Sequence, residues 1–375
     1  MHSTEPNSIR CSLYRGGTSK GVMFRRLELS EDFPTAHMLR VFGSPDVKQI
    51  DGLGGATMQT SKAMIVGPAT VPDADIQMTF GQVSLKDASV DWKSVCGNMT
   101  SAVGPFAINE GMVPAVEPVT AVRIYSVNAK KYVTAHVPVK NGRAQSDGDF
   151  AIPGVPGTGA RIDLHWLVPA GSITGKLLPT GNARDEVTLA DGRKFHISIV
   201  DAGNLTVFCD ARELGLNGTE LPAEFDANRE WQTTIEELRC RAAEMSGLVK
   251  NWREGSAKSP GMPKIGYVAA PVSYKSISGA VSLDDVDIVA RLMSATLMHK
   301  SYMGAGAVCT SAAAAIPGTI VHELSSKHAD VVRIGHPAGV MDSIVKARGE
   351  NGAVVIESGS FARTARRIMD GVAYL

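Results

Sequence analysis

The chain has 375 residues, 44% of them hydrophobic and 20% charged, which is typical of a soluble globular protein with room for two domains. Lys plus Arg and Asp plus Glu both total 38, so no net field favours nucleic acid or an acidic membrane surface. Aromatic residues make up only 6%, which argues against a base-stacking surface. A small molecule is therefore the expected partner.

The sequence contains no targeting or metal-binding pattern. The N-terminal segment is polar, and no run reaches the ~18 apolar residues that span a bilayer. The five cysteines are widely spaced without a C-x-x-C pair, and the nine histidines form no H-E-x-x-H pattern. We therefore expect a cytoplasmic protein with neither a disulfide framework nor a bound metal.

The chain begins with a strand–loop–strand pattern rich in glycine. An apolar strand over residues 9–13 leads into the loop 15–21 (Arg-Gly-Gly-Thr-Ser-Lys-Gly), and a second strand follows at residues 22–24. Three glycines, two hydroxyls and two cations in one loop can direct amides and side chains at an anion, so carboxylate binding is one interpretation. A plain glycine hairpin is the alternative, and the glycine spacing excludes a Walker A loop.

A second glycine loop precedes a candidate catalytic lysine. Residues 29–42 have an acidic start and helical spacing, and they predict a helix. The loop 50–56 (Ile-Asp-Gly-Leu-Gly-Gly-Ala) follows, and Lys62 opens a strand over 63–66. Apolar neighbours would favour the neutral amine of Lys62, which could then act as a base. A solvated strand lysine is the alternative.

The middle of the chain predicts mainly strands. Alternating segments at 75–80, 82–85, 121–126 and 131–139 favour a run of antiparallel strands rather than βαβ units. Residues 151–159 contain two prolines and three glycines, and they are the best linker candidate before a strand at 161–168.

Within this region, residues 95–111 (Val-Cys-Gly-Asn-Met-Thr-Ser-Ala-Val-Gly-Pro-Phe-Ala-Ile-Asn-Glu-Gly) predict a short buried helix that stops at Gly111. Cys96 would lie at its N-terminus, where free N–H groups and the helix dipole favour a thiolate or a bound anion. Gly97 allows backbone to approach a ligand closely, and Asn98 offers both a donor and an acceptor. A buried structural cysteine is the alternative.

The second half of the chain contains a weak repeat of the cysteine and small-residue helix found at residues 95–111. Strands are predicted at 194–199, 205–209, 266–271, from 280, 331–335, 339–348 and 352–357, and helices at 228–247, 286–299, 310–316 and from 361. The glycine-rich run 303–309 leads into a small-residue helix that contains Cys309, 213 positions after Cys96 (309 − 96). The echo indicates a duplicated two-domain architecture. Cys309 is flanked by small apolar residues, so we expect it to be a structural cysteine.

Several motifs occur in one order along the chain: residues 15–21, 51–56, Thr60-Ser61-Lys62, Asp91-Trp92, Cys96-Gly97-Asn98, 315–319 and 335–337. Together they resemble the PrpF-type isomerases, which include 2-methylaconitate cis–trans isomerase, 4-oxalomesaconate tautomerase and aconitate isomerases. The resemblance implies an α+β protein with the diaminopimelate epimerase-like fold. Two similar domains, 1–180 with Lys62 and Cys96, and 181–375, would each wrap a curled mixed sheet around a central helix. The active site would lie in the cleft between them, and the last helix would pack on the first domain.

The resemblance also assigns roles to residues. Lys62 and Cys96 would be the acid–base pair. Met303 stands nearest to the position of the epimerase's second catalytic cysteine, so Lys62 would replace that thiol. The expected substrate-binding residues are Arg15, Gly17, Thr18, Ser19, Lys20, Gly54, Gly55, Ser61, Gly97, Asn98, Asn182 and Met303.

The implied reaction moves a proton on carbon. A base removes a proton next to a carboxylate-conjugated alkene, and a proton returns at the other end of the allylic anion, with no cofactor or metal. Ala56-Thr57 and Val90-Asp91-Trp92 favour an unsaturated tricarboxylic acid of the 2-methylaconitate or aconitate type. The alternatives are a 4-oxalomesaconate tautomerase, a 3-methylitaconate-type delta-isomerase and a non-catalytic tricarboxylate-binding protein. The sequence leaves open whether the chain forms a homodimer.

Overall fold

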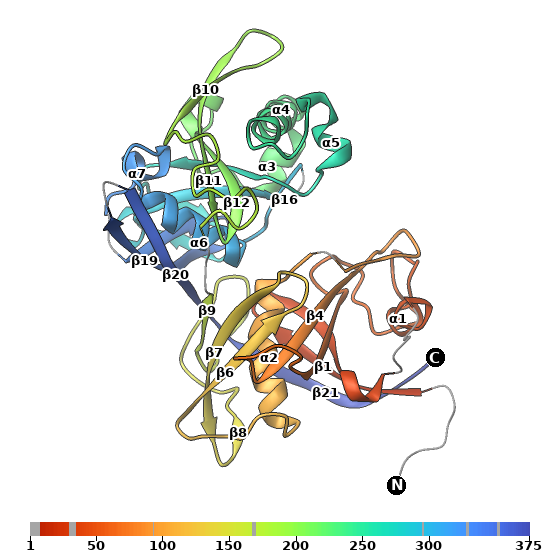
Figure 1. Cartoon of the computed structure of the whole chain (residues 1–375). Helices are drawn as coiled ribbons and strands as arrows, with labels where there is room; N and C mark the ends of the chain where they lie inside the picture. Colours follow the sequence, from red (N-terminus) through yellow and green to blue (C-terminus); the bar gives the residue numbers. More distant parts are fainter. Residues whose placement is uncertain are drawn as a thin grey trace. The chain divides into compact units, whose positions relative to one another are not determined.

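The computed structural model describes residues 8–29, 35–92, 94–166, 170–294, 296–327, 330–350 and 353–375 (Figure 1). The chain divides into two compact units, Met1–His165 with Ala362–Leu375, and Trp166–Phe361. The first unit thus ends at His165, whereas the sequence placed the boundary after residue 180, and it also contains the C-terminal segment. Among the described residues, no helix combines the length and the apolar character needed to cross a membrane.

The first unit is a mixed sheet that curls around one buried helix. Its strands are β1 (Ser8–Gly16), β2 (Ser19–Arg25), β3 (Lys62–Pro68), β4 (Ile76–Val83), β5 (Val90–Asp91), β6 (Val119–Ser126), β7 (Lys131–Lys140), β8 (Arg143–Ala144), β9 (Ile162–Trp166) and β21 (Ala365–Tyr374). The pairs β21–β1, β1–β2, β3–β4 and β6–β7 are antiparallel, whereas β2–β3 and β4–β6 are parallel. The helix α2 (Gly97–Asn109) contacts β1 and β21 as well as β7 and β8, so the sheet surrounds it.

The composition of α2 explains its central place. Every residue of α2 from Met99 to Ile108 is buried. Gly104 lies against β7, where an added Cβ would be 2.7 Å from Val137 Cγ2. A helix covered on all sides needs apolar or small residues all round, which accounts for its lack of a polar face. The helix predicted over residues 95–111 is confirmed, and Gly111 ends it with a φ of +68°.

The outer face of the sheet carries α1 (Thr35–Phe42), whose Phe42 shares an apolar core with Val22 and Ala63. Because side chains alternate along a strand, Lys62 points to the opposite face, which α2 covers. The helix predicted over 29–42 is confirmed for Thr35–Phe42, and residues 30–34 lie outside the described ranges.

The second unit also contains a mixed sheet, and its described residues form more helices than those of the first unit. Its strands are β10 (Asp185–Thr188), β11 (Lys194–Ala202), β12 (Asn204–Asp210), β13 (Lys264–Ala269), β14 (Tyr274–Ser276), β15 (Gly279–Val281), β16 (Ile288–Ser294), β17 (Leu297–Met298), β18 (Val331–His336), β19 (Gly339–Glu350) and β20 (Ala353–Arg363). Its helices are η2 (Ala211–Leu214), α3 (Pro222–Ala227), α4 (Arg229–Met245), η3 (Trp252–Glu254), α5 (Gly255–Lys258), η4 (Leu283–Asp285), α6 (Gly304–Ala314) and α7 (Ile320–Leu324). The helix α4 confirms the prediction over residues 228–247.

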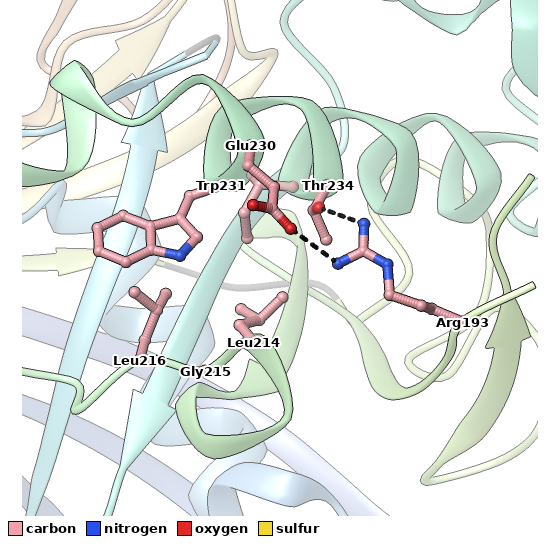
Figure 2. Close-up of a pocket in the computed structure, with 8 residues that line it drawn as sticks. Arg193, Leu214, Gly215, Leu216, Glu230, Trp231 and Thr234 are labelled. Carbon is pink, nitrogen blue, oxygen red and sulfur yellow. Dashed lines mark hydrogen bonds and ion pairs between the residues drawn. The ribbon is translucent and has the colours of Figure 1, made fainter. Parts of the chain in front are cut away.

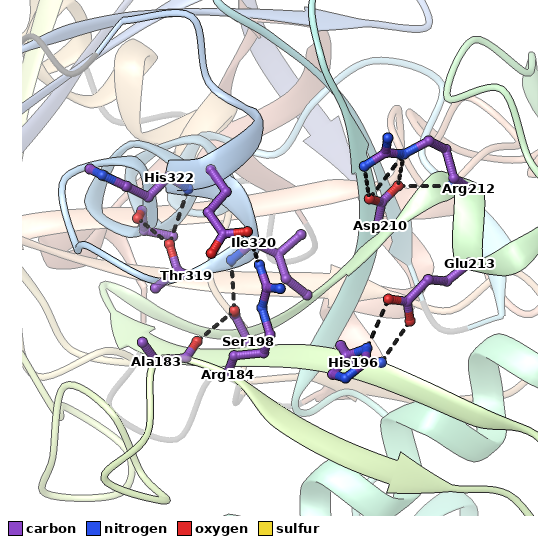
Figure 3. A network of polar contacts seen from close by, with 12 residues as sticks. Ala183, Arg184, His196, Ser198, Asp210, Arg212, Glu213, Thr319, Ile320 and His322 are labelled. Carbon is purple, nitrogen blue, oxygen red and sulfur yellow. Dashed lines mark hydrogen bonds and ion pairs between the residues drawn. The ribbon is translucent and has the colours of Figure 1, made fainter.

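A network of polar contacts holds α7 to β11 in this unit (Figure 3). The hydroxyl of Ser198 donates to the carbonyl of Ala183 at 2.6 Å and accepts from the N–H of Ile320 at 2.9 Å. Thr319 caps α7 by accepting from the N–H of His322. The start of α7 is therefore fixed by two hydroxyl groups. They accept hydrogen bonds from N–H groups that have no partner within the helix.

The two units repeat one order of strand pairing, as the sequence echo predicted. In the series β1, β2, β3, β4, β6, β7 the pairs are antiparallel, parallel, antiparallel, parallel and antiparallel. The series β11, β12, β13, β16, β18, β19 has the same order. A buried helix, α2 or α6, follows the fourth strand in each series. The N-caps of these helices are Cys96 and Met303, so Met303, not Cys309, is the counterpart of Cys96.

One predicted feature of the first unit's sheet is wrong. The sequence favoured antiparallel strands for the segments between residues 75 and 139, but β4 and β6 are parallel with α2 between them, which is a βαβ arrangement. The physical reason is that a parallel pair needs a crossover connection, and α2 supplies it.

Two predicted helices are strands. The segment 286–299 contains β16 and β17. Residues 288–293, apolar except for Arg291, are all buried, a pattern that periodicity cannot separate from a buried helix. The segment from 361 forms the end of β20 and then β21, where exposed and partly buried residues alternate and the strand pairs with β1. The expected strand at 161–168 is observed as Ile162–Trp166, and residues 167–168 lie outside the described ranges. The expected linker at 151–159 lies inside the first unit.

Candidate active site

Cys96 is the N-cap residue of α2 and has an extended backbone. Its carbonyl accepts from both the N–H and the hydroxyl of Thr100, each at 3.0 Å, which fixes the residue at the first turn of the helix. The thiol is partly exposed, whereas the other four cysteines are buried. Burial raises the pKa of Cys11 to about 11 and that of Cys309 to about 12, so neither is a ready thiolate at neutral pH.

The first glycine loop lies directly against the start of α2. The Ser19 hydroxyl is 3.9 Å from the Cys96 sulfur, and Asn98 Nδ2 donates to the hydroxyl of Thr18 at 3.0 Å. Gly17 has a φ of +52° and no room for a Cβ, because the Asn98 side chain occupies that space. The loop is therefore a tight hairpin whose glycine allows Asn98 to approach, and carboxylate binding by this loop stays a prediction.

The cations of this loop have different surroundings. Arg15 Nη1 donates to the carbonyls of Gly17 at 3.0 Å and Thr364 at 2.9 Å. Burial, together with the nearby charge of Arg366, lowers the pKa of Arg15. These contacts make Arg15 a support for the loop backbone. The Nζ of Lys20 instead reaches toward the second loop, 3.3 Å from where a Cβ on Gly55 would lie.

Lys62 occupies the start of β3 with its amine inside the unit. It is only 9% exposed, so it is not the solvated strand lysine of the alternative interpretation. Its Nζ donates to Gln82 Oε1 at 2.6 Å and lies 5.2 Å from the centre of the Phe80 ring. The Gln82 amide in turn donates to the carbonyl of Ser61 at 2.9 Å, which fixes the orientation of its oxygen.

A close approach at Gly21 brings the start of α2 beside Lys62. Gly21 pairs with Lys62 across β2 and β3. A Cβ on Gly21 would be 2.5 Å from the Lys62 carbonyl oxygen and 2.8 Å from the Cε of Met99, one turn into α2. Glycine is thus required at this position, where the backbone of β3 and the Met99 side chain of α2 both come close to β2.

The second glycine loop is tied to α1 and to Gln49. Gly54 N–H donates to the Phe42 carbonyl at 3.3 Å. The Gln49 oxygen accepts from the Ser61 hydroxyl at 2.5 Å and from the N–H of Ala56 at 3.0 Å. The Ser61 side chain is fully buried, so its observed contacts are those of a loop anchor.

Two expected binding residues belong to the second unit. Asn182 is exposed, and its Nδ2 donates to Asp185 Oδ1 at 2.7 Å. Met303 is the N-cap of α6. The cluster around Cys96 in the first unit therefore contains neither of them, and their roles stay predictions.

Sequence reasoning missed one residue at this cluster, Arg363. Its guanidinium is buried, and its Nε donates to Asn98 Oδ1 at 2.9 Å. The two residues are 265 positions apart, so no local motif could join them. The signal that could have helped is the alternating pattern after Arg363, which marks a strand returning to the first unit.

The second unit has a separate pocket of about 100 Å³ (Figure 2). Trp231, Leu214, Leu216 and Ile235 are among its lining residues. At its rim Arg193 Nη2 donates to the Thr234 hydroxyl at 3.0 Å, and Arg193 also lies 3.7 Å from Glu230. No residue that the sequence assigned to the site lines this pocket.

Comparison with known proteins identifies a close group of relatives. The sequence model of the family described as "PrpF protein" matches residues 7–375. The chain is 44% identical to 3-methylitaconate isomerase of Eubacterium barkeri, covering 98% of this chain and 97% of that one. It is 38% identical to 2-methyl-aconitate isomerase of Shewanella oneidensis, covering 97% and 96%.

Solved structures agree with these matches. A methylitaconate-delta-isomerase superposes with a TM-score of 0.86 at 43% identity, covering 98% of this chain and 95% of that one. A hydroxyproline epimerase from Agrobacterium vitis superposes with a TM-score of 0.57 at 11% identity, covering 99% and 94%, which shows a shared fold alone. The expected α+β, epimerase-like fold is confirmed.

Proposed function

The chain belongs to the PrpF family, and on this premise we propose that it isomerises a short unsaturated carboxylic acid by moving a proton on carbon. The observation that carries the proposal is the presence of two candidate proton-transfer groups in the first unit. Lys62 is a buried amine fixed by Gln82, and Cys96 is a partly exposed thiol at a helix N-terminus. Such groups suit acid–base chemistry at carbon.

The proposed reaction uses the surroundings of these two groups in order. One of them, as a base, takes a proton from the carbon next to the conjugated alkene, and the electron pair spreads into the alkene and its carboxylate. The N–H groups at the start of α2 stabilise the negative charge that develops. The other group, as an acid, returns a proton at the far end of the allylic anion, which shifts the double bond. Rotation within the anion, followed by return of a proton to the carbon that lost it, would instead interconvert the cis and trans isomers.

The substrate's carboxylates would accept hydrogen bonds from the Ser19 hydroxyl, the Lys20 amine and the first-turn amides of α2. Charge-assisted hydrogen bonds of this kind contribute about 1.5–3 kcal/mol each. A 2-methylaconitate or aconitate-type tricarboxylate is the first candidate, supported by Ala56-Thr57, by Val90-Asp91-Trp92 and by the 38% identical relative. Methylitaconate is the second candidate, supported by the 44% identical relative and the structural match.

Proton NMR in heavy water tests the proposal. The protein is incubated with trans-aconitate, 2-methyl-cis-aconitate, 4-oxalomesaconate and 3-methylitaconate in turn. We expect isomerisation with deuterium incorporation, and the acid with the highest kcat/KM identifies the substrate. A rise in melting temperature with one of the acids but no exchange would instead support the non-catalytic binding protein.

A further inference from the structure

The side chain of Gln82 holds the amine of Lys62. The two residues lie directly opposite each other in the antiparallel pair β3–β4, so their side chains leave the sheet on the same face. Gln82 Oε1 accepts from Lys62 Nζ at 2.6 Å, which is short for a hydrogen bond between nitrogen and oxygen. Because the carboxamide carries no charge, it fixes the amine without acting as a counter-ion.

The carboxamide of Gln82 is itself oriented from its nitrogen end. Its Nε2 donates to the carbonyl of Met58 at 3.2 Å and to the carbonyl of Ser61 at 2.9 Å. A primary amide has two N–H donors, so these two carbonyls use both of them. A flipped amide would direct N–H groups at the amine and lone pairs at two carbonyls. The oxygen of Gln82 therefore has to face Lys62.

The aromatic ring of Phe80 limits the same amine from a second direction. Phe80 lies two residues before Gln82 on β4, so its side chain leaves the same face of the sheet. Lys62 Nζ is 5.2 Å from the centre of this ring. A charged lysine has three N–H donors, and the bond to Gln82 occupies one of them. The amine is thus held from two directions without using all of its capacity for proton exchange.

The acceptors that orient Gln82 belong to the segment between the second glycine loop and β3. The Ser61 carbonyl also accepts from the N–H of Val83 at 3.1 Å, and the Ser61 hydroxyl donates to Gln49 Oε1 at 2.5 Å. Gln49 in turn accepts from the N–H of Ala56 at 3.0 Å. The carbonyl that fixes the amide is therefore fixed by its own contacts, which makes Gln82 a rigid partner for the amine.

A second glutamine on the same strand shows the simpler role of holding a loop. Gln77 Oε1 accepts from the N–H of Thr70 at 3.2 Å and from the Thr70 hydroxyl at 2.8 Å, which ties the loop before β4 to that strand. Gln82 also contacts a loop, but it does so through its nitrogen. Its oxygen is directed at the amine that we assign to proton transfer.

We propose that Gln82 is a positioning residue of the isomerase site, which holds the Lys62 amine in the orientation needed for proton transfer. This inference rests on the proposed function and adds the group that aligns one of its two proton carriers. Proton transfer requires close alignment of the reacting atoms, and a displacement of about 1 Å can cost ~10²-fold in rate. Loss of Gln82 should therefore lower kcat, whereas KM should change little because other residues bind the carboxylates.

The test is steady-state kinetics of Gln82→Met with the best acid of the panel. Methionine has a similar length but neither the amide oxygen nor the N–H donors. We expect kcat to fall at least ~10-fold while KM stays within about threefold of the wild type. A kcat within about threefold of the wild type, or a loss that lies entirely in KM, overturns the proposal.

The matched control is Gln77→Met, which removes the same groups from the same strand at a loop contact. Its kcat and KM should both stay within about twofold of the wild type. An equal loss of kcat in Gln77→Met would show that any weakening of β4 lowers turnover, and it overturns the positioning role.

Should Gln82→Met fail to fold, Gln82→Glu carries the same test. Glutamate keeps the size of the side chain and an oxygen for the amine, but it cannot donate to the carbonyls of Met58 and Ser61. The carboxylate would lose its fixed orientation and add a counter-ion, so kcat should again fall at least ~10-fold. An unchanged kcat in Gln82→Glu overturns the proposal.

Crystal structures of the wild type and of Gln82→Met separate this inference from the proposed function. In the variant, the Lys62 amine should be displaced or should occupy more than one rotamer. An amine that keeps its wild-type position in the variant overturns the positioning role, whatever the kinetics. A displaced amine in a protein whose wild type isomerises none of the acids would refute the proposed function, while the role of Gln82 in holding Lys62 stands.

Discussion

The starts of α2 and α6 occupy the same place in two repeats, yet their N-cap residues differ in chemistry. Lys62 and Lys264 are both the first residue of the third strand, and they pair with Gly21 and Thr206 on the second strand. The N-caps that follow are Cys96 in the first unit and Met303 in the second. A thioether has no proton to exchange, so the second repeat keeps the lysine but lacks its acid–base partner.

The comparison also explains why Cys309 is not a second Cys96. It lies inside α6, fully buried, and its thiol donates to the Val200 carbonyl at 3.3 Å. With the N-caps aligned, the offset between repeats is 207 (303 − 96), so Cys309 corresponds to the buried Ala102. The same residue type is partly exposed at a helix start and fully buried six residues further into the equivalent helix, where burial suppresses the thiolate.

The largest expected effect comes from changing the two lysines separately. Lys62→Met should lower kcat by about 10²–10⁴-fold, the usual contribution of a general acid or base. Lys264→Met should leave kcat within about threefold of the wild type, since the second repeat lacks a partner for it. Steady-state kinetics with the best acid of the panel provides the measurement. If Lys62→Met kept more than about a tenth of the rate, or if Lys264→Met lost as much as Lys62→Met, the catalytic asymmetry between the repeats would be wrong.

The two cysteines should give the next largest difference. Cys96→Ser keeps the shape of the side chain but makes it a much weaker acid, so we expect a ~10²-fold or larger loss of isomerisation with some deuterium exchange at one carbon. Cys309→Ser should keep nearly full activity. Iodoacetamide at neutral pH should modify Cys96 ahead of Cys309, whose pKa burial raises to about 12. Activity lost in step with modification of Cys309 would reverse these assignments.

The sequence was sufficient for features with a local cause. The helix after Cys96 was predictable because its small apolar residues and the stop at Gly111 lie within one short stretch. The hairpin at residues 15–21 was predictable for the same reason, since its glycines mark a turn that requires a positive φ. Burial of Lys62 was only one of two interpretations, and the structure decided it through Gln82 and Phe80.

Features with a distant cause were missed. Residues 288–293 of β16 are apolar except for Arg291 because the strand is buried on both faces, and such a run fits a helix equally well. Arg363 meets Asn98 only because the C-terminal strand returns to pair with β1. Neither local sequence indicates that pairing, so Arg363 could be assigned to the cluster only from the structure.

The smallest expected effect concerns the free-energy cost of burying the charged amine of Lys264 in the second unit. Burial, with a further contribution from the charge of Arg239, lowers the pKa of Lys264. Between this lowered pKa and the ordinary value of ~10.4, the unfolded chain binds more protons than the folded one, so stability rises with pH. Below that window the full penalty for burying the charge is present. Lys264→Met removes the penalty and should raise the free energy of unfolding at neutral pH by about 1 kcal/mol.

Urea unfolding at pH 7 and at pH 10 checks this expectation, with Lys194→Met as the control. Lys194 is exposed, and its ion pair with Glu186 raises its pKa, so its contribution to stability is present at neutral pH and is lost as pH rises through that raised value. The two variants should therefore move in opposite directions at pH 7. At pH 10 the Lys264→Met difference should shrink, whereas the Lys194→Met difference should largely persist because pH 10 is still below the raised pKa of Lys194. A Lys264→Met protein less stable than the wild type at pH 7 would mean that the amine makes a favourable contact in the second repeat, and the two lysines would then be more alike than the comparison of α2 and α6 indicates.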